Sequence, residues 1–167
     1  EGLPGVFHVS ARTVATQALN IFGDHSDVMA CRQTGFAMLA EGNVQEVMDL
    51  SPVAHLSAIS GGVPFINFFD GFRTSHEIQK IEVVDYEDLG KLLDWEAVEA
   101  FRHRALNPDH PVIRGTSQNP DIYFQTREAV NSYYEAIPDL VEKTMKELSA
   151  ITGREHHLFD YHGAKDA

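Results

Sequence analysis

The sequence predicts an α/β fold in which a mostly parallel sheet is flanked by layers of helices. Short apolar or β-rich runs alternate along the chain with segments of helical periodicity. Residues 63–71 form a nearly continuous apolar run that does not alternate, which is typical of a parallel strand covered on both faces. At 167 residues, the chain is long enough for one domain with a substantial core.

The composition argues against several classes of partner. The chain has 13 Lys and Arg against 25 Asp and Glu, a formal net charge of -12, whereas a nucleic acid needs a basic face. Its single cysteine, Cys31, cannot form an internal disulfide, and no run approaches the ~20 apolar residues that span a bilayer. We therefore expect a cytoplasmic protein with no nucleic-acid or membrane partner. Because the sequence has no initiating Met and no signal-like opening, we expect residues 1–167 to be a single partial domain of a longer chain.

The first third is predicted to contain strands and a helix. Residues 5–9 are the first strand candidate. Residues 12–22 follow as a helix, because their apolar side chains recur on one face and a glycine comes next. Residues 28–39 are predicted to be a strand, or a strand and a turn at residues 34–35.

Asn43 is predicted to cap the next helix, since Glu46 follows three residues later as in a capping box. Pro52 must kink this helix or restart it after Ser51, because proline has no N–H to donate to the preceding turn. The strongest strand of the sequence, residues 63–71, comes next.

The second half is predicted to be mainly helical. Residues 106–121 form a long, polar, proline-rich connection, either a surface excursion or a segment that wraps a neighbouring domain. Residues 156–163 are a final strand candidate. Helix starts are predicted at four places: Thr74 with Glu77, Asp94, Asn119–Pro120 and Pro138. The last helix is expected to end at Gly153 and to carry one stripe of side chains, Val141, Met145, Leu148 and Thr152.

Common catalytic and metal motifs are missing from the sequence. It has no HExxH, CxxC, GxGxxG, GxxxxGK[ST] or nucleophile-elbow pattern. If the last segment is a strand, His156, Asp160 and His162 share one face, but a solvated or interdomain edge is a better interpretation than a metal site. Cys31 is expected to be a buried, inert thiol.

Two charged residues stand where predicted strands end. Asp70 precedes a glycine at the carboxyl end of the best strand, where open α/β sheets place ligands. An Asx-type turn or a pair with Arg73 is the favoured role for it. Arg12 follows the first strand, and two uses are left open: an internal ion pair, or a two-pronged contact with a small carboxylate.

Six segments in one order carry a resemblance to a known family: LPGVFHVSART, IFGDHSDV, RQTGFAML, VPFINFFDGFRTSHEIQKIE, NPDIYFQTREA and LFDYHGAKDA. Together they resemble pyruvate:ferredoxin (flavodoxin) oxidoreductase, a thiamine diphosphate and iron–sulfur enzyme, through essentially all of the chain. The resemblance assigns the chain to the later part of the N-terminal domain, which is similar to the pyrimidine-binding domain of thiamine enzymes.

The resemblance implies oxidative decarboxylation of pyruvate to acetyl-CoA and carbon dioxide, with coenzyme A as acetyl acceptor and ferredoxin or flavodoxin as electron acceptor. It implies a homodimer as the full enzyme. Arg12 matches the family arginine beside the substrate carboxylate, and no catalytic residue is expected within this chain.

The resemblance also implies which parts of the enzyme lie elsewhere. The glutamate that bonds the aminopyrimidine of thiamine diphosphate would precede Glu1. The magnesium ligands and the cysteines of the [4Fe-4S] clusters would follow Ala167. We therefore expect this chain alone to be inactive and to bind no cofactor.

Two other classes of function stay open: a stand-alone carboxylate-binding α/β module, and a non-catalytic subunit of a split 2-oxoacid oxidoreductase. A glutamate-bearing segment upstream and cysteine motifs downstream would distinguish the large oxidoreductase from both.

Overall fold

The computed structural model describes residues 2–112 and 117–166. Its centre is a parallel sheet in the order β1-β3-β2, formed by β1 (Val6–Ala11), β2 (Ala37–Glu41) and β3 (Phe65–Asp70). This confirms the α/β class and the parallel sheet. The helices in chain order are α1 (Ser26–Ala30), α2 (Val44–Gly61), α3 (Arg73–His76), α4 (Tyr86–Leu92), α5 (Trp95–His103), α6 (Pro120–Ala129) and α7 (Asn131–Thr152).

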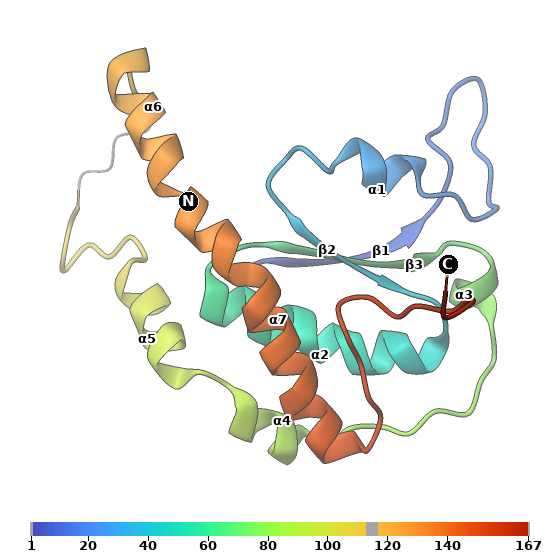
Figure 1. Ribbon diagram of the computed structural model, residues 1–167. Coiled ribbons are helices and arrows are strands. Elements are labelled where there is room, and N and C mark those ends of the chain that lie inside the picture. The colour runs from blue at the N-terminus through green and yellow to red at the C-terminus, as the bar shows by residue number, and fades with distance from the viewer. Residues whose placement is uncertain (1, 113–116, 167) are drawn as a thin grey trace.

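Helices cover both faces of the sheet (Figure 1). Short α1 lies over one face, while α2 lies under the other and α7 packs against α2. Four consecutive residues of β3, from Phe65 to Phe68, are buried, as the apolar run predicts for a central parallel strand. The larger core cluster joins β3, α2 and α7 through Phe65, Leu50, Val53, Ala54, Ala58, Ile137, Val141, Met145 and Leu148.

Several local signals are confirmed. The strand predicted at residues 5–9 is β1, and Asn43 caps α2, its side-chain oxygen accepting the Glu46 amide at 3.0 Å. Asp94 caps α5 in the same way. Pro120 opens α6, although Asn119 makes no capping hydrogen bond. Gly153 ends α7 in the left-handed conformation, with φ of 71°.

The helix predicted at residues 12–22 is wrong. These residues form an irregular loop, in which Arg12 and Gly23 make an isolated antiparallel bridge. The side chains expected to be buried along one helix face are exposed, including Leu19 at 75% and Phe22 at 58%. A helix this short depends on burial of its apolar face, and in the described residues these apolar side chains stay largely exposed.

Other boundaries also differ from the prediction. The segment at residues 28–39 has the turn at 34–35, but helix α1 precedes that turn and the strand follows it. Of the kink and the restart predicted at Pro52, the restart does not occur, because α2 is one helix; α7 begins at Asn131 and runs through Pro138, where its start was predicted. Burial of long apolar faces in both helices offsets the hydrogen bond that each proline removes.

The remaining corrections concern α3 and the chain end. No Thr74–Glu77 capping box forms: Glu77 follows the last residue of α3, and Thr74 is buried. Residues 156–163 are not a strand, because the Leu158 amide donates to the Glu142 carboxylate instead of to a neighbouring strand. In the 106–121 connection, residues 106–112 and 117–119 form no helix or strand, and residues 113–116 lie outside the described part. No helix among the described residues has the length and apolarity that a membrane crossing needs.

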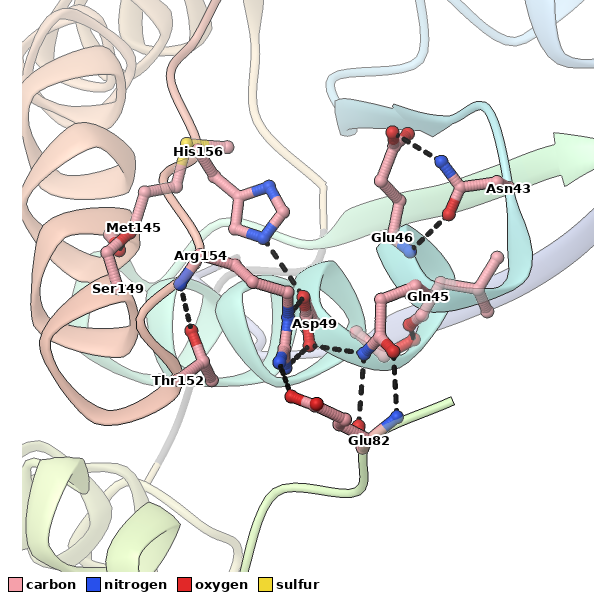
Figure 2. Close-up of polar contacts among 12 residues, drawn as sticks. Asn43, Gln45, Glu46, Asp49, Glu82, Met145, Ser149, Thr152, Arg154 and His156 are labelled. Atoms are coloured by element: carbon pink, nitrogen blue, oxygen red, sulfur yellow. Dashed lines mark hydrogen bonds and ion pairs between the residues drawn. The ribbon is translucent and has the colours of Figure 1, made fainter. Parts of the chain in front are cut away.

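A buried carboxylate connects three separate parts of the chain (Figure 2). Asp49 of α2 is fully buried and accepts hydrogen bonds from the Arg154 guanidinium at 2.7 and 2.8 Å, from Gln45 and from His156. Arg154 also pairs with Glu82 at 2.6 Å. Burial alone would raise the pKa of the Asp49 carboxyl, but these hydrogen bonds outweigh it and hold the pKa below its usual value.

A second buried carboxyl has the opposite environment. Glu41, at the end of β2, is 5% exposed, and neither of its side-chain oxygens has a hydrogen-bond partner among the described residues. Burial raises the pKa of this carboxyl to about 8, and the negative charge of Glu46 adds to the shift. Glu41 is therefore predominantly protonated at neutral pH.

Arg154→Ala should destabilise the folded chain by about 3 kcal/mol, because it leaves a buried carboxylate without its main partner. Urea unfolding at neutral pH measures this loss. Arg102→Ala is the matched control, since its pair with Glu99 is exposed and should contribute less than about 1 kcal/mol. The pKa of Asp49 is lowered by folding, so the stabilisation is present above its unfolded pKa of about 3.8 and disappears as the pH falls below it. Equal losses in the two variants would contradict this role of Arg154.

Glu41→Gln should stabilise the chain at neutral and alkaline pH. The pKa of this carboxyl is raised on folding from 4.5 to about 8, so the wild-type chain loses stability as the pH rises between these values. The loss amounts to about 3 kcal/mol at pH 7. Urea unfolding at about pH 5 and about pH 8 should show a smaller decline for Glu41→Gln than for wild type. The exposed Glu135→Gln should behave like wild type.

Candidate functional site

The candidate site lies at the carboxyl edge of the sheet, where β1 and β3 end side by side. Ala11, the last residue of β1, pairs with Asp70, the last residue of β3. The next residues are therefore neighbours as well, although they are far apart in the sequence: Arg12 follows β1 and Gly71 follows β3. Open α/β sheets bind their ligands at this edge.

Arg12 is half-buried and is held at two points. Its Nε donates to the carbonyl oxygen of Gly71 at 2.7 Å, and its backbone amide donates to the Asp27 carboxylate at 2.9 Å. The Gly71 amide in turn donates to the Ala11 carbonyl at 2.8 Å, which continues the pairing of the two strands past their ends. The position of the guanidinium is thus determined by the sheet itself.

The Arg12 guanidinium has no acidic partner among the described residues. Its hydrogen bond runs to a neutral carbonyl, and no Asp or Glu in residues 2–112 and 117–166 forms an ion pair with it. The described residues therefore contain no internal ion pair of the Arg12 side chain, which is one of the two uses that the sequence leaves open. Both terminal nitrogens of the side chain, Nη1 and Nη2, remain available as donors to an anion.

Asp70, the other charged residue at a strand end, has a structural role. Its carboxylate accepts hydrogen bonds from the amides of Phe72, at 2.9 Å, and Arg73, which confirms the Asx-type turn. The hydrogen bond from the Phe72 amide, the larger effect, lowers the pKa of this carboxyl. No ion pair with Arg73 forms in the described part of the chain. Gly23 lies directly against the same carboxylate, since a Cβ there would come within 1.6 Å of Oδ2.

Asp27 is a residue of the site that sequence reasoning missed. It stands in the first turn of α1, and its two oxygens accept from the amides of Arg12 and Val28. The loop at residues 13–26 separates Asp27 from Arg12, so sequence spacing gives no sign of the contact. The only available signal is the pair of aspartates in the GDHSD segment.

The other candidates from the sequence do not assemble into a site. His156 binds Asp49 in the interior, and no strand aligns it with Asp160 and His162. Among residues 2–112 and 117–166, no group of three or more His, Cys, Asp or Glu side chains is placed to hold a metal ion. Cys31 is half-buried beside the smaller apolar cluster, rather than fully buried as expected.

Comparison with known proteins assigns the chain to a family. The family profile described as pyruvate flavodoxin/ferredoxin oxidoreductase, thiamine diphosphate-binding, matches residues 1–146. A pyruvate-flavodoxin oxidoreductase of Klebsiella pneumoniae is 72% identical over the whole chain, and a pyruvate:ferredoxin oxidoreductase of Moorella thermoacetica is 65% identical over the whole chain. A protein of Cryptosporidium parvum named pyruvate dehydrogenase [NADP(+)] is 56% identical over 98% of the chain.

These relatives are much longer than the chain, which spans 14% of the first two and 8% of the third. The match nevertheless extends through the sheet, its carboxyl edge and helices α1 to α6, and reaches into α7. The chain belongs to the pyruvate flavodoxin/ferredoxin oxidoreductase family, as part of its thiamine diphosphate-binding region.

Proposed function

We propose that this chain supplies the arginine that binds the substrate carboxylate in an enzyme that oxidatively decarboxylates pyruvate. The products are acetyl-CoA, formed with coenzyme A, and carbon dioxide, and the electrons pass to ferredoxin or flavodoxin. Arg12 is the substrate-binding residue in this proposal. Its supporting observation is a guanidinium that is fixed at the ligand-binding edge of the sheet and has no acidic partner among the described residues.

The chemistry of pyruvate fits this arrangement. A 2-oxo acid presents a planar carboxylate, which matches the planar fork of a guanidinium through two parallel hydrogen bonds. Such charge-assisted contacts contribute about 1.5–3 kcal/mol each. A contact of this kind orients the substrate and holds its negative charge until carbon dioxide leaves.

Aromatic side chains next to the site favour the same conclusion. The rings of Phe22 and Phe72 pack edge to face at 4.7 Å, and the His25 ring packs against Phe68 at 5.2 Å. Such surroundings exclude water when a substrate and the rest of the enzyme cover them, and a dry site strengthens a contact between opposite charges.

The electron acceptor is not determined by this segment. The three relatives described above are named for flavodoxin, ferredoxin and NADP(+), yet each is at least 56% identical to this chain over nearly its whole length. We infer that the choice between acceptors belongs to other parts of the protein. The lengths of these relatives favour a segment of a large oxidoreductase over the stand-alone module and the split subunit.

The described residues lack the ligand sets that two of the expected cofactors need. They contain no cluster of carboxylates for the magnesium ion of thiamine diphosphate, and the chain has one cysteine, whereas a [4Fe-4S] cluster takes four. The unpartnered Glu41 carboxyl is buried on the α2 side of the sheet and presents no oxygen at the surface. We therefore propose that the magnesium ligands and the cluster cysteines lie in the remainder of the enzyme, and we derive no step through these cofactors.

Arg12→Ala in the full-length enzyme should lower kcat/KM for pyruvate by about 10- to 100-fold, the equivalent of one lost charge-assisted contact. The KM for pyruvate should rise and kcat should fall, while the KM for coenzyme A stays unchanged. Arg12→Lys should recover only part of the loss because it lacks the planar fork. Unchanged kinetics in Arg12→Ala would remove Arg12 from the site.

The isolated chain 1–167 should not catalyse the reaction. In the presence of thiamine diphosphate, magnesium, pyruvate and coenzyme A, it should reduce methyl viologen no faster than a blank without protein. The full-length enzyme under the same conditions is the positive control. Sustained pyruvate-dependent reduction by the isolated chain would contradict the assignment of cofactor sites to the rest of the enzyme.

A further inference from the structure

The contacts of Arg12 leave only one edge of its guanidinium available to a ligand. A guanidinium has five N–H groups, one on Nε and two on each terminal nitrogen, and it can grip a carboxylate either by Nε with one Nη or by the two Nη atoms together. The Gly71 carbonyl occupies Nε at 2.7 Å. The side-on grip is therefore closed, and the end-on grip through Nη1 and Nη2 remains.

The absence of a side chain at position 71 allows this contact. A Cβ on Gly71 would lie 2.4 Å from Cγ and 2.9 Å from Nε of Arg12, and 2.3 Å from the Ala11 carbonyl oxygen. These distances are too short for any real Cβ, so a methyl group would displace the Arg12 side chain and press on the Ala11 carbonyl. The backbone φ of Gly71 is not in the left-handed region, so the requirement for glycine arises from this close approach alone.

The Asp27 carboxylate fixes the other end of the same residue. One oxygen accepts the Arg12 amide at 2.9 Å and the other accepts the Val28 amide at 2.6 Å, which ties the exit of β1 to the start of α1. Asp27 forms no ion pair with the Arg12 guanidinium, so it orients the backbone without neutralising the side chain.

We propose that Gly71 and Asp27 are positioning residues that aim Arg12, so that the carboxylate of the 2-oxo acid is bound end-on by Nη1 and Nη2. This inference rests on the proposed function of Arg12 and adds the orientation in which it meets its substrate. It also assigns a functional reason to the glycine after β3 and to the aspartate in the first turn of α1.

A double-mutant cycle in the full-length enzyme tests the role of Gly71. Gly71→Ala should lower kcat/KM for pyruvate by about tenfold or more, as expected for a misplaced binding group, and should leave the KM for coenzyme A unchanged. On an Arg12→Ala background, the same substitution should lower kcat/KM by a clearly smaller factor, because the guanidinium that it misplaces is already gone and only the clash with the Ala11 carbonyl remains. Gly90→Ala is the control, since a Cβ there meets no atom within 4 Å.

Asp27 variants provide an independent measurement if Gly71→Ala enzyme does not accumulate. Asp27→Ala should raise the KM for pyruvate and lose its effect on the Arg12→Ala background. Asp27→Asn keeps one acceptor oxygen and should recover part of the loss. If Asp27 had a purely structural role, its variants would reduce the amount of active enzyme, and the KM values for pyruvate and for coenzyme A would both stay unchanged. A crystal structure with pyruvate should place its carboxylate oxygens on Nη1 and Nη2, with Nε still on the Gly71 carbonyl.

The outcomes separate this inference from the proposed function. Wild-type kinetics in Arg12→Ala would overturn the proposed function and the inference with it. A loss in Arg12→Ala with wild-type kinetics in both the Gly71 and Asp27 variants would overturn only the positioning roles. The positioning roles would also be overturned if the effects of Gly71→Ala and Arg12→Ala on the activation free energy were fully additive. A crystal structure with a substrate oxygen bound to Nε of Arg12 would overturn them as well.

Discussion

The parallel pairing of β3 with both of its neighbours is the constraint on which the other features depend. Because β1 and β2 run parallel to β3, the chain leaves all three strands at one edge of the sheet. The register that sets Ala11 opposite Asp70 then brings Arg12 beside Gly71. A slip of one residue would turn the buried side chains of β3 to the wrong faces and would separate this pair.

The two buried carboxyls, Asp49 and Glu41, differ in their charge because they differ in their hydrogen-bond donors. Asp49 and Glu41 have similar burial, yet the pKa of Asp49 is lowered and that of Glu41 is raised to about 8. The difference is the supply of donors: Asp49 receives a guanidinium, an imidazole and an amide, whereas Glu41 receives none from the described residues. Asp49 can therefore remain charged and hold α2 to the chain end after α7, while Glu41 is buried as a neutral acid.

Local sequence signals predicted much of this fold. The predictions fail where the local structure depends on contacts with residues far away in the sequence. The caps at Asn43 and Asp94 and the stop at Gly153 involve neighbouring residues only, so the sequence contains all the information that they need. The loop at 12–22 and the helix start at Asn131 depend on which surfaces are available for packing. At the site, Arg12 could be predicted from its place after a strand. Its partners could not, because they depend on strand register and on the path of a loop.

The proposed binding of an anion by an acidic chain is physically consistent, because the net negative charge and the Arg12 cation act over different distances. At physiological ionic strength the field of an exposed carboxylate is screened within about 8 Å, so the net charge of -12 has little effect inside a covered site. A half-buried guanidinium acts at contact distance and is screened much less. Binding then depends on the placement of one cation rather than on a positive surface. That dependence accounts for two fixed contacts at Arg12, one on its backbone amide and one on Nε.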